Sequence, residues 1–308
     1  MRTRSLIPAA LLLCGCSLHH RPVAPEPARG PARDTLLLFD QSRTDSVARR
    51  GMADGMGAFL GSDIAFLRAG APPVYGADIA RAMLASTANR GLGNPTWVPL
   101  GGGVSNDLRS GYTWGMAAHA ESSSGRVQVE RYVAYWQRTS GQSWRILAYA
   151  EIGGPTAGEM PLTPAQITPP RPRIARPTDE ARTNVRAADS LFSDLSYRMG
   201  ASFAFANTIA DDGAMFGSPA ILIGPKAVKE YFETRGEPAS LTWQPVYASI
   251  AGSRDLGFTI GESVTTTRGP SGAAVQRFGK YLTVWRKQKD ASWKFEVDGG
   301  NSAPSPAR

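Results

Sequence analysis

The chain has 308 residues, of which 42% are hydrophobic and 19% are charged. That length predicts about two domains, and the composition excludes a disordered polyelectrolyte, because there is enough apolar material for packed cores. The formal charge of +8 does not indicate a nucleic-acid binder, since residues 1–33 alone carry +4 and residues 187–301 are neutral. A nucleic-acid binder concentrates its positive charge on a folded face or in a dense tail.

The N-terminus predicts an exported lipoprotein. A basic start precedes an apolar run from Leu6 to Leu13 that is too short to span a bilayer. The tetrapeptide Leu13-Cys14-Gly15-Cys16 resembles the bacterial lipobox, in which a small residue precedes the lipidated cysteine. We therefore expect a signal peptide over residues 1–15 and lipidation of Cys16 rather than of Cys14, which follows a leucine. An ordinary secretory signal with incidental cysteines is the alternative.

The residues after the anchor indicate where the protein is held. Ser17 differs from the Asp-type signal that retains lipoproteins of diderm bacteria at the inner membrane, so an outer-membrane anchor facing the periplasm is expected. Residues 16–33 are rich in Pro, Ala and Arg and predict an extended tether. No cysteine follows Cys16, so the folded part contains no disulfide.

The chain contains an internal duplication, which is the most informative feature of the sequence. The matching segments are Trp97-Val98-Pro99 with Trp243-Gln244-Pro245, Gly111-Tyr112-Thr113-Trp114-Gly115 with Gly257-Phe258-Thr259-Ile260-Gly261, and Arg131-Tyr132 with Lys280-Tyr281. The first two pairs share an offset of 146 residues, and the third has an offset of 149. The copies predict one domain over residues 34–153, a proline-rich linker over 154–182, a second domain over 183–301 and a tail over 302–308.

Helices are expected before strands in the second copy. The pattern predicts helices over 188–199, after Gly200 and over 227–232, then strands over 241–250, 256–266, 275–288 and 292–298. Helices followed by an antiparallel meander indicate an α+β fold.

Several motifs of the second copy carry a family resemblance. They are Gly200, Asp211-Asp212-Gly213, Gly224 with its helix, Trp243-Gln244-Pro245, Leu256 to Gly261, Gly279 to Lys287 and Ser292-Trp293-Lys294. With these motifs the copy resembles the nuclear transport factor 2-like, ketosteroid isomerase-like superfamily, in particular SnoaL-like domains and domain of unknown function 4440. The resemblance covers nearly all of the second copy and is looser in the first. It implies two cone-shaped domains, each a curved sheet wrapped around helices with a largely apolar cavity.

The catalytic residues of ketosteroid isomerases are not matched. In those enzymes an Asp base follows the first strand, and a helix Tyr joins a second acid to stabilise the enolate. The base position falls on Gly217 or Ser218 in the second copy and near Arg68 in the first, and the Tyr position falls near Phe192 and Thr44. The resemblance therefore does not imply isomerase chemistry by that mechanism.

Metal and triad chemistry are also disfavoured. The chain has three histidines, and His119 is the one inside a predicted domain. A Ser-His-Asp triad or a multi-His metal site would therefore depend on a single residue, so we expect no metal and no cofactor.

Strand alternation divides the aromatic residues between two faces. Tyr281, Thr283 and Trp285 share one face, and Leu282 and Val284 share the other. We expect one face to line a cavity and the other to form an interface, either between the two copies as an intramolecular pseudo-dimer or in a homodimer. The expected ligand-binding residues are Phe216, Trp243, Tyr247, Phe258, Tyr281 and Trp285 in the second copy and Trp97, Tyr112 and Trp136 in the first. Ordinary core packing is the alternative for this set.

Two acids are candidates for a general base. Glu262 alternates with Phe258 and Ile260, on a face expected to be apolar, so its pKa would be raised by burial. A cross-strand cation, Lys280 or Arg277, is the alternative explanation. Asp298 lies near the end of the last strand, where a solvent-facing position is the alternative.

Three functions remain open at this point. The favoured one is non-catalytic binding of a small apolar or amphipathic molecule by an envelope lipoprotein, with the membrane reached through its lipid anchor. The second is an isomerase, dehydratase or lyase-type enzyme that uses Glu262 or Asp298. The third is a structural or interaction module whose cones are filled by their own side chains.

Overall fold

The computed structural model describes residues 26–87, 93–120, 127–139, 141–153, 179–217 and 220–304. The expected signal peptide, the lipidation site Cys16 and most of the proline-rich linker lie outside these residues. No helix in the described part of the chain is long and apolar enough to cross a membrane.

The two halves repeat one order of elements. The first domain comprises α1 (Glu26–Gln41), α2 (Arg43–Gly57), β1 (Leu60–Leu67), β2 (Val74–Tyr75), α3 (Ala77–Thr87), β3 (Thr96–Val104), β4 (Ser110–Ala120), β5 (Val127–Gln137) and β6 (Arg145–Ile152). The second domain comprises α4 (Asp179–Met199), α5 (Ala201–Thr208), β7 (Ile209–Phe216), β8 (Ile221–Ile223), α6 (Gly224–Arg235), β9 (Ser240–Ile250), β10 (Leu256–Arg268), β11 (Ala274–Lys287) and β12 (Trp293–Ser302).

Both domains contain a six-stranded sheet with equivalent topology. The strand orders are β2-β1-β6-β5-β4-β3 and β8-β7-β12-β11-β10-β9. The first long strand of each domain pairs in parallel with the last, and all other neighbours are antiparallel. The expected fold class, two α+β cone-shaped domains, is confirmed.

Helix α1 begins earlier than the sequence predicted. Residues 26–33 were expected to be part of an extended tether, yet they form the first turns of α1 despite Pro31. Ala32, Leu36 and Phe39 recur at helical spacing and pack on the core of the first domain, with Leu36 fully buried. This tertiary contact outweighs the weak helix propensity of the proline-rich start.

A glycine interrupts the helices at the same point in both domains. Gly51 inside α2 has φ 75°, and Gly200 between α4 and α5 has φ 89°. A positive φ suits glycine because it has no Cβ. When Gly51 is aligned with Gly200, the residues before Gly51 correspond to α4. Asp40 and Arg43 of the first domain then correspond to Asp189 and Phe192 of the second.

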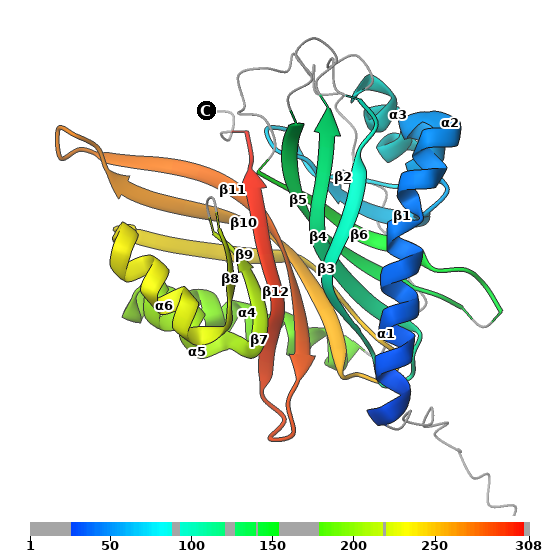
Figure 1. Cartoon of the computed structure of the whole chain (residues 1–308). Helices are drawn as coiled ribbons and strands as arrows, with labels where there is room; N and C mark the ends of the chain where they lie inside the picture. The colour runs from blue at the N-terminus through cyan, green and yellow to red at the C-terminus, as the bar shows by residue number, and fades with distance from the viewer. Residues whose placement is uncertain are drawn as a thin grey trace, which may run out of the picture.

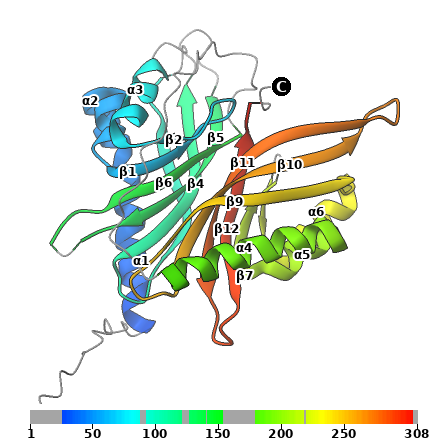
Figure 2. The same ribbon diagram turned by 180° about the vertical axis from the view of Figure 1, so that it is seen from behind.

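The two sheets pack against each other through their outer faces. Figures 1 and 2 show α1–α3 and α4–α6 on opposite sides of the molecule, with the sheets between them. One buried apolar cluster joins the domains and consists of Ala65, Leu67, Tyr112, Val133, Tyr135, Ala148, Ala150, Ile152, Ala214, Ala251, Leu256, Phe258, Ile260, Leu282, Val284 and Val297. At its centre the rings of Tyr135 and Phe258 lie 4.6 Å apart.

Polar contacts surround this inter-sheet cluster. The Tyr112 hydroxyl donates to Glu296 over 2.6 Å, and the side-chain amide of Asn301 donates to the Glu151 carbonyl over 2.6 Å. The backbone N–H of Asn106 donates to Asp255 at 3.1 Å. These bonds fix the register of one sheet on the other, because each satisfies a polar group at the edge of a dry contact.

Candidate functional site

The interior of the first cone is filled by a buried cation. Arg43 is fully buried and forms an ion pair with Asp40, which is also fully buried. The Arg43 guanidinium lies 4.6 Å from the ring centre of Trp97 and 4.7 Å from that of Tyr132. Burial raises the pKa of Asp40, while the charge of Arg43 and a hydrogen bond from the Tyr132 hydroxyl act in the opposite direction. The centre of this cone is therefore occupied by the protein itself.

The interior of the second cone resembles that of the first but lacks the buried cation. Phe192 stands where the first domain has Arg43, and Asp189 stands in the place of Asp40. The Asp189 carboxylate accepts hydrogen bonds from the Trp243 indole N–H and the Tyr281 hydroxyl, each over 2.7 Å. Burial raises the pKa of Asp189 to about 6, although these hydrogen bonds lower it. Asp189 thus ties α4 to β9 and β11.

Asp298 is the acid that distinguishes the second cone. It occupies the position that corresponds to Tyr149, whose hydroxyl accepts from the Trp97 indole over 3.1 Å in the first domain. The Thr283 hydroxyl donates to Asp298 over 2.5 Å. Burial raises the pKa of Asp298 to about 7, the Thr283 hydrogen bond lowers it, and the nearby charge of Asp189 raises it. Asp298 forms no ion pair with any described residue. With a pKa of about 7, its carboxyl group changes between the neutral and the charged form near neutral pH.

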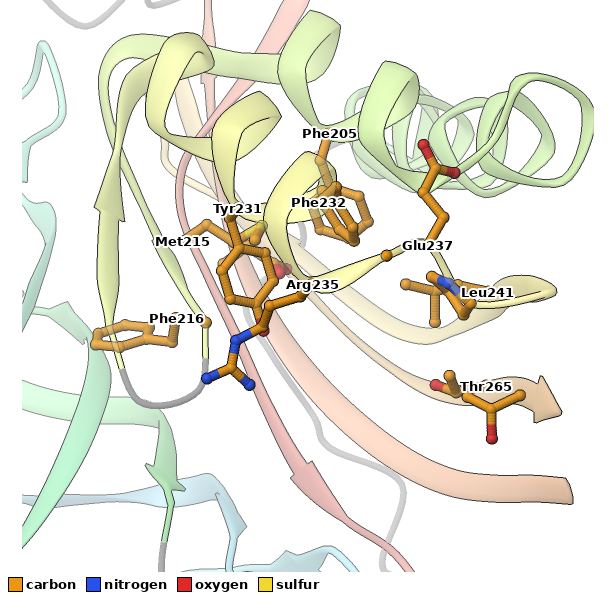
Figure 3. Close-up of a pocket in the computed structure, with 14 residues that line it drawn as sticks. Phe205, Met215, Phe216, Tyr231, Phe232, Arg235, Glu237, Leu241 and Thr265 are labelled. Carbon is orange, nitrogen blue, oxygen red and sulfur yellow. The ribbon is translucent and has the colours of Figure 1, made fainter. Parts of the chain in front are cut away.

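Asp298 lies in a pocket of about 410 Å³. The pocket is lined by Phe205, Met215, Phe216, Gly217, Tyr231, Phe232, Arg235, Gly236, Glu237, Pro238, Leu241, Thr265, Thr267 and Asp298. Figure 3 shows the rings of Phe205 and Phe232 beside each other, with Tyr231 and Phe216 at one end and Leu241 at the other. The volume and the mainly apolar walls suit a small organic ligand.

The first domain supports one wall of this pocket. The Arg131 guanidinium, from β5, lies 5.7 Å from the ring centre of Phe216 and donates hydrogen bonds to the carbonyls of Gly217 and Ala220. The indole of Trp114, from β4, meets the Phe216 ring edge-on at 6.1 Å. Phe216 and Gly217 therefore face the pocket on one side and the first domain on the other.

Sequence reasoning located part of this site. Phe216 and Asp298 line the pocket. Trp243, Tyr281 and Trp285 belong to the interior of the second cone, where they bond to Asp189 or Thr259 and lie outside the pocket lining. Trp97 and Trp136 are equally internal, but in the filled first cone, where both are almost fully buried.

Three predicted ligand-binding residues face the other domain instead of a cavity. Tyr112, Tyr247 and Phe258 belong to or pack on the inter-sheet cluster. Their assignment to a cavity was wrong, because alternation along a strand separates two faces without showing which face covers the helices. The same error affected Glu262.

Glu262 is exposed, so its interpretation as a buried pocket acid was wrong. It lies on the same outer face as Phe258 but beyond the edge of the inter-sheet contact. Burial raises the pKa of Tyr75 in the first domain, and the charge of Glu262 raises it further. Lys280 lies opposite it in register, but the Lys280 amine donates to the Ser302 carbonyl over 2.6 Å.

Sequence reasoning missed most of the pocket lining, including three residues of α6. Tyr231, Phe232 and Arg235 line the pocket at helical spacing, and Phe205, Met215, Pro238 and Leu241 add to its apolar part. The helix was expected over 227–232, and the i, i+4 relation of Tyr231 and Arg235 was the available signal. In the described part of the chain, no three His, Cys, Asp or Glu residues are grouped so as to hold a metal ion.

Comparison with known proteins finds similar solved structures but no matching sequence family. No protein-family model matches it, and no curated protein matches it. A ketosteroid isomerase-like protein from Erwinia carotovora atroseptica matches with 18% identity and a TM-score of 0.36, over 42% of this chain and 100% of its own. A nuclear transport factor 2-like superfamily protein from Salmonella enterica serovar Typhimurium matches with 10% identity and a TM-score of 0.34, over 42% of this chain and 94% of its own.

A third match has the same character. A nuclear transport factor 2-like protein with a cystatin-like fold from Novosphingobium aromaticivorans is 18% identical with a TM-score of 0.32, over 42% of this chain and 84% of its own. Each matched length is about that of one domain. The structural neighbours of this two-domain chain are thus nuclear transport factor 2-like and ketosteroid isomerase-like proteins.

Proposed function

We propose that the second domain binds a small molecule with an apolar ring in its pocket and that Asp298 exchanges a proton with this molecule. The observation that carries the proposal is an acid with a pKa of about 7 among apolar pocket walls, where the first domain has Tyr149. A general acid or base works best when its pKa lies near the working pH. This combination favours an isomerase, dehydratase or lyase-type activity over binding alone.

The simplest chemistry is proton abstraction next to a carbonyl group. The Asp298 carboxylate removes a proton from the carbon beside the ligand carbonyl, and the electron pair of the C–H bond passes into the enolate, whose charge rests on oxygen. The neutral Asp298 then returns the proton to the same carbon or to another carbon of the conjugated system. The hydroxyl of Thr283 stabilises the carboxylate form through its hydrogen bond.

This chemistry predicts deuterium exchange into a simple ketone. With 2-tetralone as the probe in deuterium oxide, NMR should show faster loss of the α-hydrogen signals in the presence of the protein. Asp298→Asn should lower the protein-dependent rate by about 100-fold or more. The rate should rise with pH as Asp298 loses its proton and level off above the pKa of about 7.

Two variants make the exchange test specific. Thr265→Trp fills the pocket from β10 and should abolish the protein-dependent exchange, whereas Asp211→Asn removes an exposed carboxylate of β7 and should leave it unchanged. If 2-tetralone binds in the pocket but exchanges at the buffer rate, Asp298 is not a base and the pocket is a non-catalytic binding site.

The first domain serves, in this proposal, as a scaffold. Its cone is filled by Arg43 and the surrounding rings, and its sheet supports the wall of the second pocket. The sequence left open a structural or interaction module whose cone is filled by its own side chains. We propose this role for the first domain alone.

We further propose that the protein is anchored in the cell envelope through Cys16, as the lipobox predicts. In a diderm bacterial host grown with radiolabelled palmitate, Cys16→Ala should abolish labelling and membrane association, and Cys14→Ala should leave both intact. Label retained in Cys16→Ala and lost in Cys14→Ala would assign the anchor to the other cysteine.

A further inference from the structure

Arg235 gives the pocket a distinctive charge at its mouth. Among the described residues that line the pocket, it is the one with a cationic side chain. It lies in the last turn of α6, and its guanidinium carbon is 5.6 Å from the ring centre of Tyr231. In Figure 3 the guanidinium extends along Tyr231 towards the Phe216 end of the pocket. Arg235 has no ion pair or hydrogen bond with any described residue.

Glu237, another charged residue of the pocket lining, forms no ion pair with this cation. Glu237 also lines the pocket, but its carboxylate lies against Gly200 at the start of α5, where an added Cβ would collide with it. Figure 3 shows the Glu237 carboxylate turned towards the helices and away from Arg235. A helix N-terminus favours a negative charge, which accounts for this orientation.

A second cation adds to the positive potential at the same end. Arg131 of the first domain packs on the far side of Phe216 and donates to the Gly217 carbonyl. It does not line the pocket, so it acts on a ligand through its field and through the wall that it supports. The Tyr231 and Phe216 end of the pocket is therefore flanked by one guanidinium from each domain.

We propose that the ligand of this pocket carries an anionic group, such as a carboxylate, sulfonate or phosphate, which Arg235 binds while the apolar ring packs between Phe205, Phe232 and Leu241. A guanidinium suits this role because it is planar, weakly hydrated and able to donate two parallel hydrogen bonds. The inference rests on the proposed function, since it requires the ligand to occupy the pocket. It narrows the ligand class to amphipathic ring acids.

A matched pair of fluorescent probes tests the proposal. 1-Anilinonaphthalene-8-sulfonate and N-phenyl-1-naphthylamine share their rings, and one of them carries a sulfonate. In titrations of the two-domain protein, Arg235→Gln should weaken binding of the sulfonate probe about tenfold, the loss expected for one charge-assisted hydrogen bond. The same variant should change the affinity of the neutral probe by less than about twofold, because ring packing is retained.

Further variants separate the charge from the pocket. Lys226→Gln removes a positive charge from the same helix outside the pocket lining and should alter neither affinity. Arg235→Lys should recover part of the sulfonate affinity. Thr265→Trp should displace both probes, and the difference from the unmodified protein defines the pocket-bound fraction.

The possible outcomes distinguish the two proposals. If Arg235→Gln leaves the sulfonate affinity unchanged, or weakens both probes equally, the anionic ligand class is wrong, while binding in the pocket stands. If neither probe responds to Thr265→Trp, the pocket binds no ring molecule, and the proposed function fails together with this inference.

Discussion

Replacing Arg43 with methionine is expected to lower the free energy of unfolding by about 3–5 kcal/mol, the usual cost of removing one partner of a buried ion pair. Arg43 and Asp40 are both fully buried at the centre of the first cone. Methionine fills much of the same volume, so the loss comes mainly from leaving the Asp40 carboxylate without a cation. The measurement is urea unfolding followed by tryptophan fluorescence and circular dichroism.

Two further variants identify the cause of this loss. In Asp40→Asn/Arg43→Met the uncompensated charge is absent, so most of the stability should return. Arg198→Met breaks an exposed pair with Asp194 on α4, whose side chains are 70% and 45% exposed, and should cost less than about 1 kcal/mol. An Arg43→Met variant no less stable than Arg198→Met would show that the ion pair does not hold the first cone together.

Replacing Phe258 with alanine is expected to cost about 3–5 kcal/mol, because a fully buried ring between the two sheets would leave a cavity. Phe203→Ala, at a position on α5 that is 45% exposed, is the matched control and should change stability by about 0.5 kcal/mol or less. Because the ring lies between domains, we expect one cooperative unfolding transition that shifts as a whole.

The contact across the domains can be isolated with Tyr135→Ala. The Tyr135 and Phe258 rings belong to different domains and lie 4.6 Å apart. A double-mutant cycle should therefore give a coupling energy of about 0.5–1.5 kcal/mol. Two separate unfolding transitions, with Phe258→Ala shifting one of them and a coupling energy near zero, would mean that the domains do not stabilise each other.

Repetition and alternation were the reliable signals in the sequence. The repeated tryptophan and glycine motifs lie on equivalent strands of both domains, since β3 and β9 carry Trp97 and Trp243. Alternation along β11 separated Trp285, which packs in the second cone, from Leu282 and Val284, which pack between the sheets. Both signals can be recognised without knowledge of the fold. One depends on the spacing of residues within a strand, and the other on the match between two copies of that strand.

The positions of the acids needed the tertiary structure. Asp298 and Glu262 were both candidates from strand position, yet Asp298 enters the pocket and Glu262 is exposed. An alternating pattern cannot tell these cases apart, because both faces of the second sheet are covered, one by helices and the other by the first domain. Asp298 is partly buried on the face that the helices cover, whereas Glu262 lies on the outer face beyond the contact with the first domain, so the tertiary structure determined which carboxyl group is the more buried.

The sequence by itself determined that the chain is a duplicated α+β protein, because repeats and hydrophobic periodicity are written in the order of residues. The cone shape of each copy was an expectation from the family resemblance. Only the tertiary structure decided that the first cone is closed and the second holds a pocket. Arg43 three residues after Asp40 reads as an ordinary surface pair on an amphipathic helix. Its burial depends on four aromatic rings from distant strands, and such contacts exist only once the sheet has curved around the helix.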